Sequence, residues 1–337
     1  MGRYILRRLL LMLPTLAGVT LAVFLLTQFV PGGPVEAMIS KVRAQDSMRG
    51  GDASKRLSEE EIRNIKAYFG FDQPIHIRYL RWLGGVLRGD LGRSYVYQAP
   101  VGEVILSKVP ISLFFGVTSL VIAYLVSIPL GLAKAVKRGS AFDAASSVGV
   151  LVGHVIPGWA LGIFLLVFLA GGSFLNVFPL GGIVSENFEY LGFWGKVRDF
   201  LWHMVLPLCC WLVGSFAFLT LLMKNSVIEE LNKDYVRTEL AKGVPYRRVI
   251  GRAVFRNAMI PLVTGLGGIF SVMFAGALLI ERVFDIDGMG LLFYNSIVGR
   301  DYNVVMGIIL LSGLTDMLGR LFADVMYAVV DPRIRLD

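Results

Sequence analysis

Few side chains in this sequence have the type and spacing that chemistry requires. The three histidines, His76, His154 and His203, lie too far apart along the chain to show the spacing of metal ligands. No Gly-x-x-x-x-Gly-Lys-Ser/Thr motif occurs, because the single Gly195-Lys196 pair is followed by valine. The chain therefore has no phosphate-binding loop of its own, and these observations argue against an enzyme.

Ionisable residues inside apolar segments are the next candidates, because charge is costly to place in a membrane. His154 lies just before Ile156-Pro157-Gly158, a potential helix kink, and either lines a solute pathway or forms a helix contact. Asp316, Arg320 and Asp324 recur every four residues and share one helix face. That face is either an ion relay or a ladder of ion pairs, within the chain or to a neighbouring subunit.

The elements that carry these residues are apolar segments. The 337 residues are 55% hydrophobic and 17% charged, a balance that soluble domains seldom reach. Six segments have about the length of a membrane span: roughly 1–30, 110–133, 144–170, 204–223, 257–281 and 303–328. The sequence predicts an all-α polytopic membrane protein with six transmembrane helices, the first retained because no small-x-small cleavage site follows it.

A polar excursion at 31–108 separates the N-terminal helix (1–30) from a core of five helices (109–337). We expect the excursion to be a small extracytoplasmic subdomain. Ser58 and Glu61 fit a capping box that opens one helix. Apolar spacing indicates a second helix, with Tyr79, Trp82, Leu83, Val86 and Leu87 on its apolar face.

Positive charge is unevenly distributed between the loops. Residues 224–256 hold eight Lys and Arg, whereas the loops 171–203 and 282–302 hold two each. Because Lys and Arg concentrate in cytoplasmic loops, we expect both termini and 224–256 in the cytoplasm.

The basic loop at about 224–258 carries a pattern beyond its charge. Val244-Pro245 should divide it into two short helices, near 228–242 and 246–258, because a proline disfavours helix at the preceding residue. Such a structured loop indicates a docking surface, and the alternative is an ordinary cytoplasmic loop.

The segments RTELAKG at 237–243 and RNAMIP at 256–261 resemble the EAA loop of ABC-importer permeases. The similarity is strongest to the binding-protein-dependent dipeptide/oligopeptide subgroup and extends over essentially the whole chain. Further matching segments are PGGP at 31–34, SIPLG at 127–131 and DPRI at 331–334.

Two more segments, AGGSF at 170–174 and VFPL at 177–180, resemble the Yej-type peptide permeases, whose relatives import oligopeptides and microcin C. The sequence departs from the family locally. Glu239-Leu240 stands where the peptide subgroup has Ala-Arg, and Gly33 stands where many members have Asp.

The resemblance implies the type I ABC importer permease fold and a place in the bacterial inner membrane. The chain would be half of an alternating-access pathway that carries oligopeptides, including microcin C-like peptides, from periplasm to cytoplasm. Its implied partners are a second homologous permease, two ATPase subunits or one fused ATPase, a periplasmic peptide-binding protein and membrane lipids, with no nucleic acid. The chain would bind no cofactor, and ATP and magnesium would be held by the ATPases.

The family resemblance and the residues themselves together indicate which residues form the functional sites. ATPase coupling is assigned to Tyr235, Thr238, Glu239, Ala241, Lys242 and Gly243. The translocation pathway is assigned to His154, Gly265, Gly268 and Ser271, with ordinary glycine packing as the alternative. Contact with the binding protein is assigned to Phe284, Asp287 and Gly288.

Two other classes of function remain open. An ion-coupled secondary transporter would use His154 and the Asp316-Arg320-Asp324 face, but no clear inverted repeat is present. A membrane scaffold without transport activity would leave the Gly- and Pro-rich spans unexplained.

Overall fold

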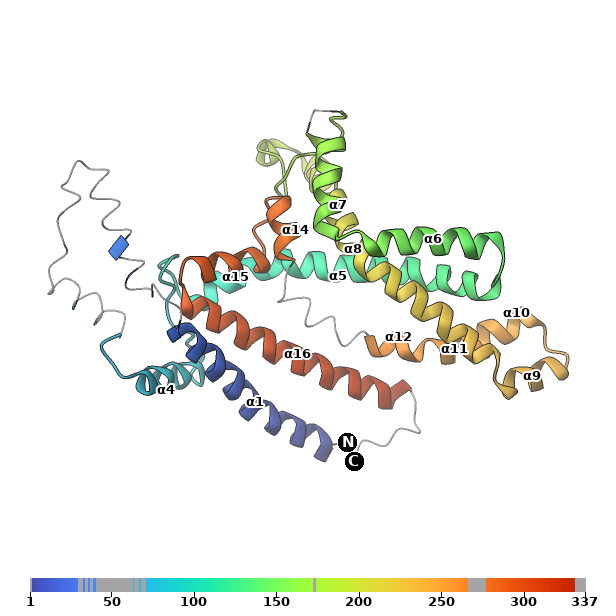
Figure 1. The fold of residues 1–337 in the computed structure, drawn as a ribbon, viewed down its shortest axis with the longest axis horizontal. Coiled ribbons are helices and arrows are strands. Elements are labelled where there is room, and N and C mark those ends of the chain that lie inside the picture. Colours follow the sequence, from blue (N-terminus) through green and yellow to red (C-terminus); the bar gives the residue numbers. More distant parts are fainter. Residues whose placement is uncertain are drawn as a thin grey trace. The chain divides into compact units, whose positions relative to one another are not determined.

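The computed structural model describes residues 2–29, 71–171, 174–265 and 277–330, and the isolated positions 33, 36, 39–40, 63 and 67. Within those ranges every regular element is a helix, apart from one isolated bridge between Arg93 and Pro100 (Figure 1). The predicted all-α class is confirmed.

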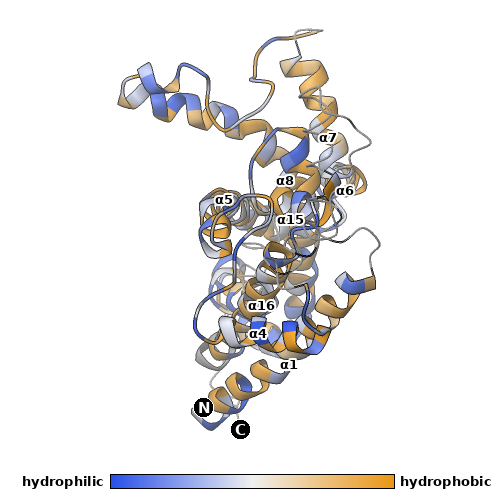
Figure 2. Cartoon of the chain, turned by 90° about the vertical axis from the view of Figure 1, so that its left-hand side faces the viewer, coloured by the Kyte–Doolittle hydropathy of each residue, from blue (hydrophilic) through white to orange (hydrophobic). Residues whose placement is uncertain are grey.

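In the part of the chain that the structure describes, four helices are each long and apolar enough to cross a bilayer. They are α1 (Gly2–Phe29), α5 (Val101–Val136), α8 (Phe193–Leu231) and α16 (Tyr302–Val330). Hydrophobic colouring predominates along α1 and α16 in Figure 2. Only 22% to 39% of their most apolar stretches is buried within the chain, which leaves most of that surface for lipid or other subunits. They match four of the six predicted spans.

Two of these helices are longer than the sequence predicted. Helix α5 begins at Val101 instead of 110, and α8 covers Phe193–Leu231 instead of 204–223. Hydropathy finds only the part of a helix that suits the hydrocarbon core, and the polar turns at its ends carry no such signal. The helix predicted over 228–242 is consequently divided between the end of α8 and a separate short helix.

The predicted third span is a bent pair of helices. Helix α6 (Ala141–Val155) is followed after Ile156-Pro157 by α7 (Gly158–Leu165), which continues as a π-helical turn, η1 (Leu166–Ala170). The two parts meet at 92°. The predicted kink is confirmed, because proline removes a backbone donor and restricts the residue before it.

The predicted fifth span is described only at its ends, by α11 (Phe255–Ala258), α12 (Ile260–Gly265) and α14 (Leu278–Val283). Its middle, 266–276, lies outside the described residues, as does the capping box of Ser58 and Glu61. The helix predicted from the spacing around Tyr79 is present as α4 (Ile75–Val86). The other outer helices are η2 (Phe188–Tyr190) and α15 (Met289–Val298).

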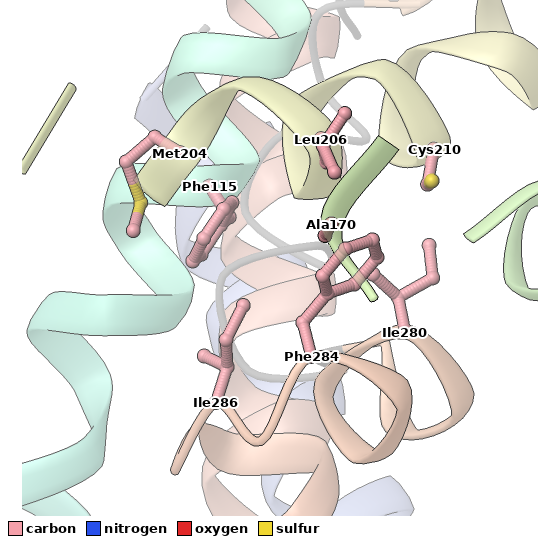
Figure 3. Close-up of a cluster of buried hydrophobic side chains, with 8 residues drawn as sticks. All are labelled: Phe115, Ala170, Met204, Leu206, Cys210, Ile280, Phe284 and Ile286. Carbon is pink, nitrogen blue, oxygen red and sulfur yellow. The ribbon is translucent and has the colours of Figure 1, made fainter. Parts of the chain in front are cut away.

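Contacts divide the chain into two compact units: one of residues 1–6, 111–291 and 315–337, and one of 7–110 and 292–314. Within the first unit, α5, α8, η1 and the α14 region share a buried apolar cluster (Figure 3). Phe115 and Phe284 are its two aromatic members. The Phe115 ring stacks on Trp211, with 4.9 Å between ring centres.

The second unit is built around the contact of α4 with α1. Tyr79 is buried, and its hydroxyl group lies 3.0 Å from the Thr20 hydroxyl and donates to the Ala17 carbonyl at 2.9 Å. Its ring lies beside Phe24, and Met306 of α16 completes this small core. Apolar packing and a hydrogen-bonded hydroxyl together fix α4 on the first span.

Helices α5 and α8 cross closely at Gly131. A Cβ atom at this position would lie 2.6 Å from Met223 Cβ and 2.8 Å from the Thr220 carbonyl oxygen. We expect Gly131→Ala to destabilise the protein by about 1–3 kcal/mol, the usual cost of overpacking. Thermal unfolding in detergent measures it, with Gly149→Ala as the control, because nothing lies within 4 Å of a Cβ there. Equal unfolding midpoints for the two variants would contradict the close crossing.

Candidate functional site

Helix α9 (Asp234–Ala241) occupies the predicted coupling loop and follows α8 after only two residues (Figure 1). Asp234 lies in its first turn, where a carboxylate suits the positive end of the helix dipole. Val236 is 2% exposed and joins a buried apolar cluster, the coupling core, that fixes α9 against its neighbours. The coupling core consists of Ala135, Met223, Val227, Val236, Val249, Val254, Ala258 and Leu262.

The end of α9 is a Schellman motif. The Val244 N–H donates to the Glu239 carbonyl at 3.2 Å, and the Gly243 N–H donates to the Leu240 carbonyl at 2.9 Å. Gly243 has φ of +80°, in the left-handed region that glycine adopts without a steric penalty. Pro245 then precedes α10 (Tyr246–Val249), η3 (Ile250–Val254) and α11. The predicted break after Gly243 is confirmed.

A buried carboxylate at the end of α8 ties the loop together. Glu230 is 8% exposed, and it accepts a hydrogen bond from Tyr235 Oη at 2.6 Å and another from Lys233 Nζ. Asn257 Nδ2 of α11 donates to the same Tyr235 oxygen at 3.3 Å. Partial burial, together with the bond to Glu230, raises the pKa of Tyr235. Tyr235 therefore links α8, α9 and α11 as a neutral phenol.

The predicted coupling residues divide into two groups. Thr238, Ala241, Lys242 and Gly243 are exposed, whereas the Tyr235 hydroxyl faces the body of the protein. Glu239 is half-buried and pairs with Lys242 at 3.2 Å, an exposed pair that contributes little to stability. Tyr235 thus positions α9. Of the other five residues, four are exposed and available to a partner, and the half-buried Glu239 lies at the edge of the exposed face.

Sequence analysis missed two apolar side chains on the same surface. Leu240 is 39% exposed and Tyr246 is 45% exposed. A leucine on the outer face of a short polar helix was the available signal, because such a residue has no packing role of its own. Four arginines that follow Tyr246 in the chain are also exposed: Arg247, Arg248, Arg252 and Arg256. The exposed part of the loop therefore carries both apolar and cationic side chains.

A charged cluster joins α5, α6 and α8. Lys134 is fully buried, and its ammonium group donates to the hydroxyl oxygens of Ser146 and Ser147, each at 2.8 Å. The Asp143 carboxylate lies 3.3 Å from this ammonium group and 2.7 Å from Lys224 Nζ on α8. The cluster satisfies a buried cation that would otherwise be costly.

The sequence analysis counted Lys224 only among the basic residues of 224–256 and did not single out Lys134, because each looks like an ordinary lysine at the end of a span. The available signal was Ser140 followed by Asp143, Ser146 and Ser147, which are spaced to share one helix face. Ser140 is the N-cap of α6 and accepts from the Asp143 N–H.

His154 lines a cavity of about 290 Å³ between α6 and α8. Its neighbours there are Phe218, Leu221, Leu222 and Asn225. Gly265 is the last residue of α12, whereas Gly268 and Ser271 lie outside the described residues. The pathway role of all four residues stays a prediction.

The charged face of α16 is paired within the chain. Arg320 Nε donates to Asp316 Oδ2 at 2.9 Å, and Tyr4 Oη of α1 donates to Asp324 Oδ2 at 2.8 Å. The Asp316–Arg320 contact is one of the internal ion pairs that the ladder predicts, whereas the bond between Asp324 and Tyr4 is not an ion pair.

The turn after α14 is organised by Glu281, which is 1% exposed. Its carboxylate accepts from the Leu291 N–H at 2.7 Å and the Ala277 N–H at 3.0 Å. A Cβ atom on Gly288 would lie 2.6 Å from the Glu281 carboxyl carbon, so glycine leaves room for this bond.

Of the three residues assigned to binding-protein contact, only Asp287 is exposed. Phe284 is 2% exposed and belongs to the apolar cluster of Figure 3, and Gly288 is buried. We therefore correct the expectation for the Phe284 ring, which is a packing residue of this chain. The contact itself stays a prediction for the exposed part of the turn. Among the described residues, no group of three or more His, Cys, Asp or Glu side chains could hold a metal ion.

Among the described residues, several helices long and apolar enough to cross a bilayer define a multi-pass membrane protein. The sequence profile described as "Binding-protein-dependent transport system inner membrane component" matches residues 127–336. The chain belongs to this family, the membrane components of ABC transport systems.

Curated relatives match over the full length. The chain is 41% identical to the peptidoglycan transport system permease protein YejB of Agrobacterium fabrum, over 100% of this chain and 99% of the relative. It is 41% identical to the inner membrane ABC transporter permease protein YejB of Escherichia coli O157:H7, over 100% of both chains. The predicted likeness to Yej-type peptide permeases is confirmed.

The oligopeptide transport system permease protein AppB of Bacillus subtilis is 31% identical over 99% of both chains. A solved structure of the MetNI methionine ABC transporter, in an inward-facing conformation, aligns with a TM-score of 0.50 and 15% identity. It covers 68% of this chain and 96% of that chain, and it confirms the permease fold.

The charged cluster leads to a stability prediction. We expect Asp143→Asn to destabilise the protein by about 3–5 kcal/mol, because it leaves the Lys134 ammonium group buried without a carboxylate. Thermal unfolding of the purified complex measures the effect. Arg138→Gln is the control, since that exposed arginine lies nearby outside the cluster.

Adding Lys134→Met to Asp143→Asn should recover part of the loss, because it removes the uncompensated cation. A single Asp143→Asn variant as stable as the wild type would contradict this account of the cluster.

Proposed function

We propose that the chain is one permease subunit of an ATP-driven importer that carries short peptides from periplasm to cytoplasm. The names of its relatives include peptidoglycan, oligopeptide and dipeptide transport systems, whose shared chemistry is a short peptide. The observation that carries the proposal is the exposed face of α9, held by Tyr235 and Val236 at the end of a long span. Such a geometry suits force transfer from a soluble partner.

The partner at this face would be an ATPase subunit. Leu240 and Ala241 offer an apolar centre, and Thr238 and Lys242 offer polar groups beside it. ATP and magnesium would belong to that subunit, and two such subunits or one fused ATPase would serve this chain and a second homologous permease. A periplasmic peptide-binding protein would deliver the substrate near Asp287. Both termini would lie in the cytoplasm, as the distribution of Lys and Arg supports.

Movement of the ATPases would reach the spans through rigid contacts. A displacement of α9 acts on α8 through Glu230 and on α11 through Asn257. The Lys134 cluster then couples α8 to α5 and α6. Coupled motion of these helices would switch the pathway, with His154, Gly265, Gly268 and Ser271 along it, between outward and inward access.

Reconstitution tests this proposal. We expect two ATPase subunits and a second permease to co-purify with the chain in detergent. In proteoliposomes, ATP hydrolysis should rise when a peptide-loaded binding protein is added, with the empty binding protein as the control. A lone protein that takes up solute in response to a proton gradient, without an ATPase, would overturn the proposal.

Gly243 provides a residue-level test of coupling. A valine in the left-handed backbone conformation costs roughly 1–2 kcal/mol, and this cost would oppose the coupled state. We therefore expect Gly243→Val to lower peptide uptake about five- to thirtyfold. No atom lies within 4 Å of a Cβ there, so the effect comes from the backbone and not from a clash.

Gly243→Asn is the matched control, since asparagine tolerates the left-handed region. The Gly243→Val complex should still assemble, as size-exclusion chromatography would report. Normal uptake by Gly243→Val would contradict the role of this turn.

A further inference from the structure

A cavity of about 250 Å³ lies in the second unit, at the end of α1 remote from the N-terminus. Its walls come from α1, α4 with the segment that follows it, and the start of α16. Two arginines, Arg78 and Arg81, and three aromatic rings, Phe71, Trp82 and Tyr95, are among the lining residues. The proposed transport mechanism uses none of them.

Among the described residues, neither arginine has a carboxylate partner. Arg78 Nη1 donates to Gln28 Oε1 at 3.0 Å, and its guanidinium carbon lies 4.1 Å from the centre of the Phe71 ring. Arg81 donates to Gln73 Oε1 at 3.3 Å. Of the described residues on the cavity wall, Asp90 is the one acid, and it accepts a bond from the Gly92 N–H. Two guanidinium groups thus present donors that match a phosphate.

Two further donors on the cavity wall are unused. Trp82 Nε1 and Tyr302 Oη are buried atoms without a hydrogen-bond partner in the structure. Buried polar atoms are nearly always hydrogen-bonded, so these two indicate a ligand with oxygen acceptors.

An apolar strip on α1 adjoins the cavity. Phe24, Thr27 and Gln28 line the cavity, while Leu25, Leu26 and Phe29, on the same two turns, are 41%, 64% and 83% exposed. Because α1 is long and apolar enough to span the bilayer, its exposed side chains are suited to acyl chains. A ligand with an anionic head and an apolar tail would satisfy both surfaces.

We propose that this cavity binds the headgroup of an anionic phospholipid. The phosphate lies against Arg78 and Arg81, the headgroup oxygens accept from Trp82 Nε1 and Tyr302 Oη, and the acyl chains follow the strip on α1. The net charge of two arginines and one aspartate favours an anionic headgroup over a zwitterionic one. A bound peptide has no acyl chains, so it would leave the exposed apolar strip on α1 without a function.

Lipid titration of the purified, delipidated complex tests the site without any need for transport. The probes are dioctanoyl-phosphatidylglycerol, dioctanoyl-phosphatidylethanolamine, inorganic phosphate and a tripeptide, and bound lipid is counted by native mass spectrometry. We expect saturable binding of the phosphatidylglycerol. Its Kd should rise about tenfold or more in Arg78→Gln/Arg81→Gln, as loss of charge-assisted hydrogen bonds implies. Arg88→Gln, an exposed arginine outside the cavity, should leave the Kd unchanged.

Tyr302→Phe removes one unused donor and keeps the ring, so it should weaken binding severalfold even if the double arginine variant fails to fold. Equal affinity for phosphatidylethanolamine would overturn the proposal. So would competition by the tripeptide or by inorganic phosphate at the lipid's own concentration, or unchanged affinity in both variant proteins.

Discussion

The described functional region depends on one interaction, the pairing of the Asp143 carboxylate with the ammonium groups of Lys134 and Lys224. A fully buried lysine is tolerable only when its charge is met, and Asp143 meets Lys134 while it also holds Lys224 on α8. Lys224 lies less than two turns before Glu230, the acid that orients Tyr235 and hence α9. Helix α9 is therefore held by two kinds of contact, the polar series from Asp143 through α8 to Tyr235 and the apolar coupling core that contains Val236.

The sequence predicted much of this arrangement, because hydropathy and proline act locally. The spans, the bend at Pro157 and the break after Gly243 all depend on side chains near their own backbone. The burial of Lys134 and Phe284 could not be predicted in the same way. A lysine at the end of an apolar run looks identical whether it faces water or folds inward, and Phe284 depends on residues more than a hundred positions away.

Family membership and local geometry answer different questions about this chain. The full-length identity to permease proteins establishes the class, whereas the 15% identity of the MetNI alignment supports the fold alone. Geometry adds what neither comparison contains: which of the residues proposed for coupling are exposed, and that the Tyr235 hydroxyl is bonded within the chain. The same reasoning separates the turn after α14 into a buried scaffold around Glu281 and an exposed remainder that includes Asp287.

The unbroken course of α8 has a consequence for how this chain can vary in length. Its 39 residues run continuously from Phe193 to Leu231, and each residue turns a helix by about 100°. Inserting or deleting one residue between Lys224 and Glu230 would rotate the Glu230 carboxylate away from Tyr235 while Asp143 kept Lys224 in place. That stretch of α8 is therefore fixed in register to the single residue. The turn at Lys137–Gly139 is constrained as well, because the Gly139 N–H donates to the Asp143 carboxylate at 3.3 Å.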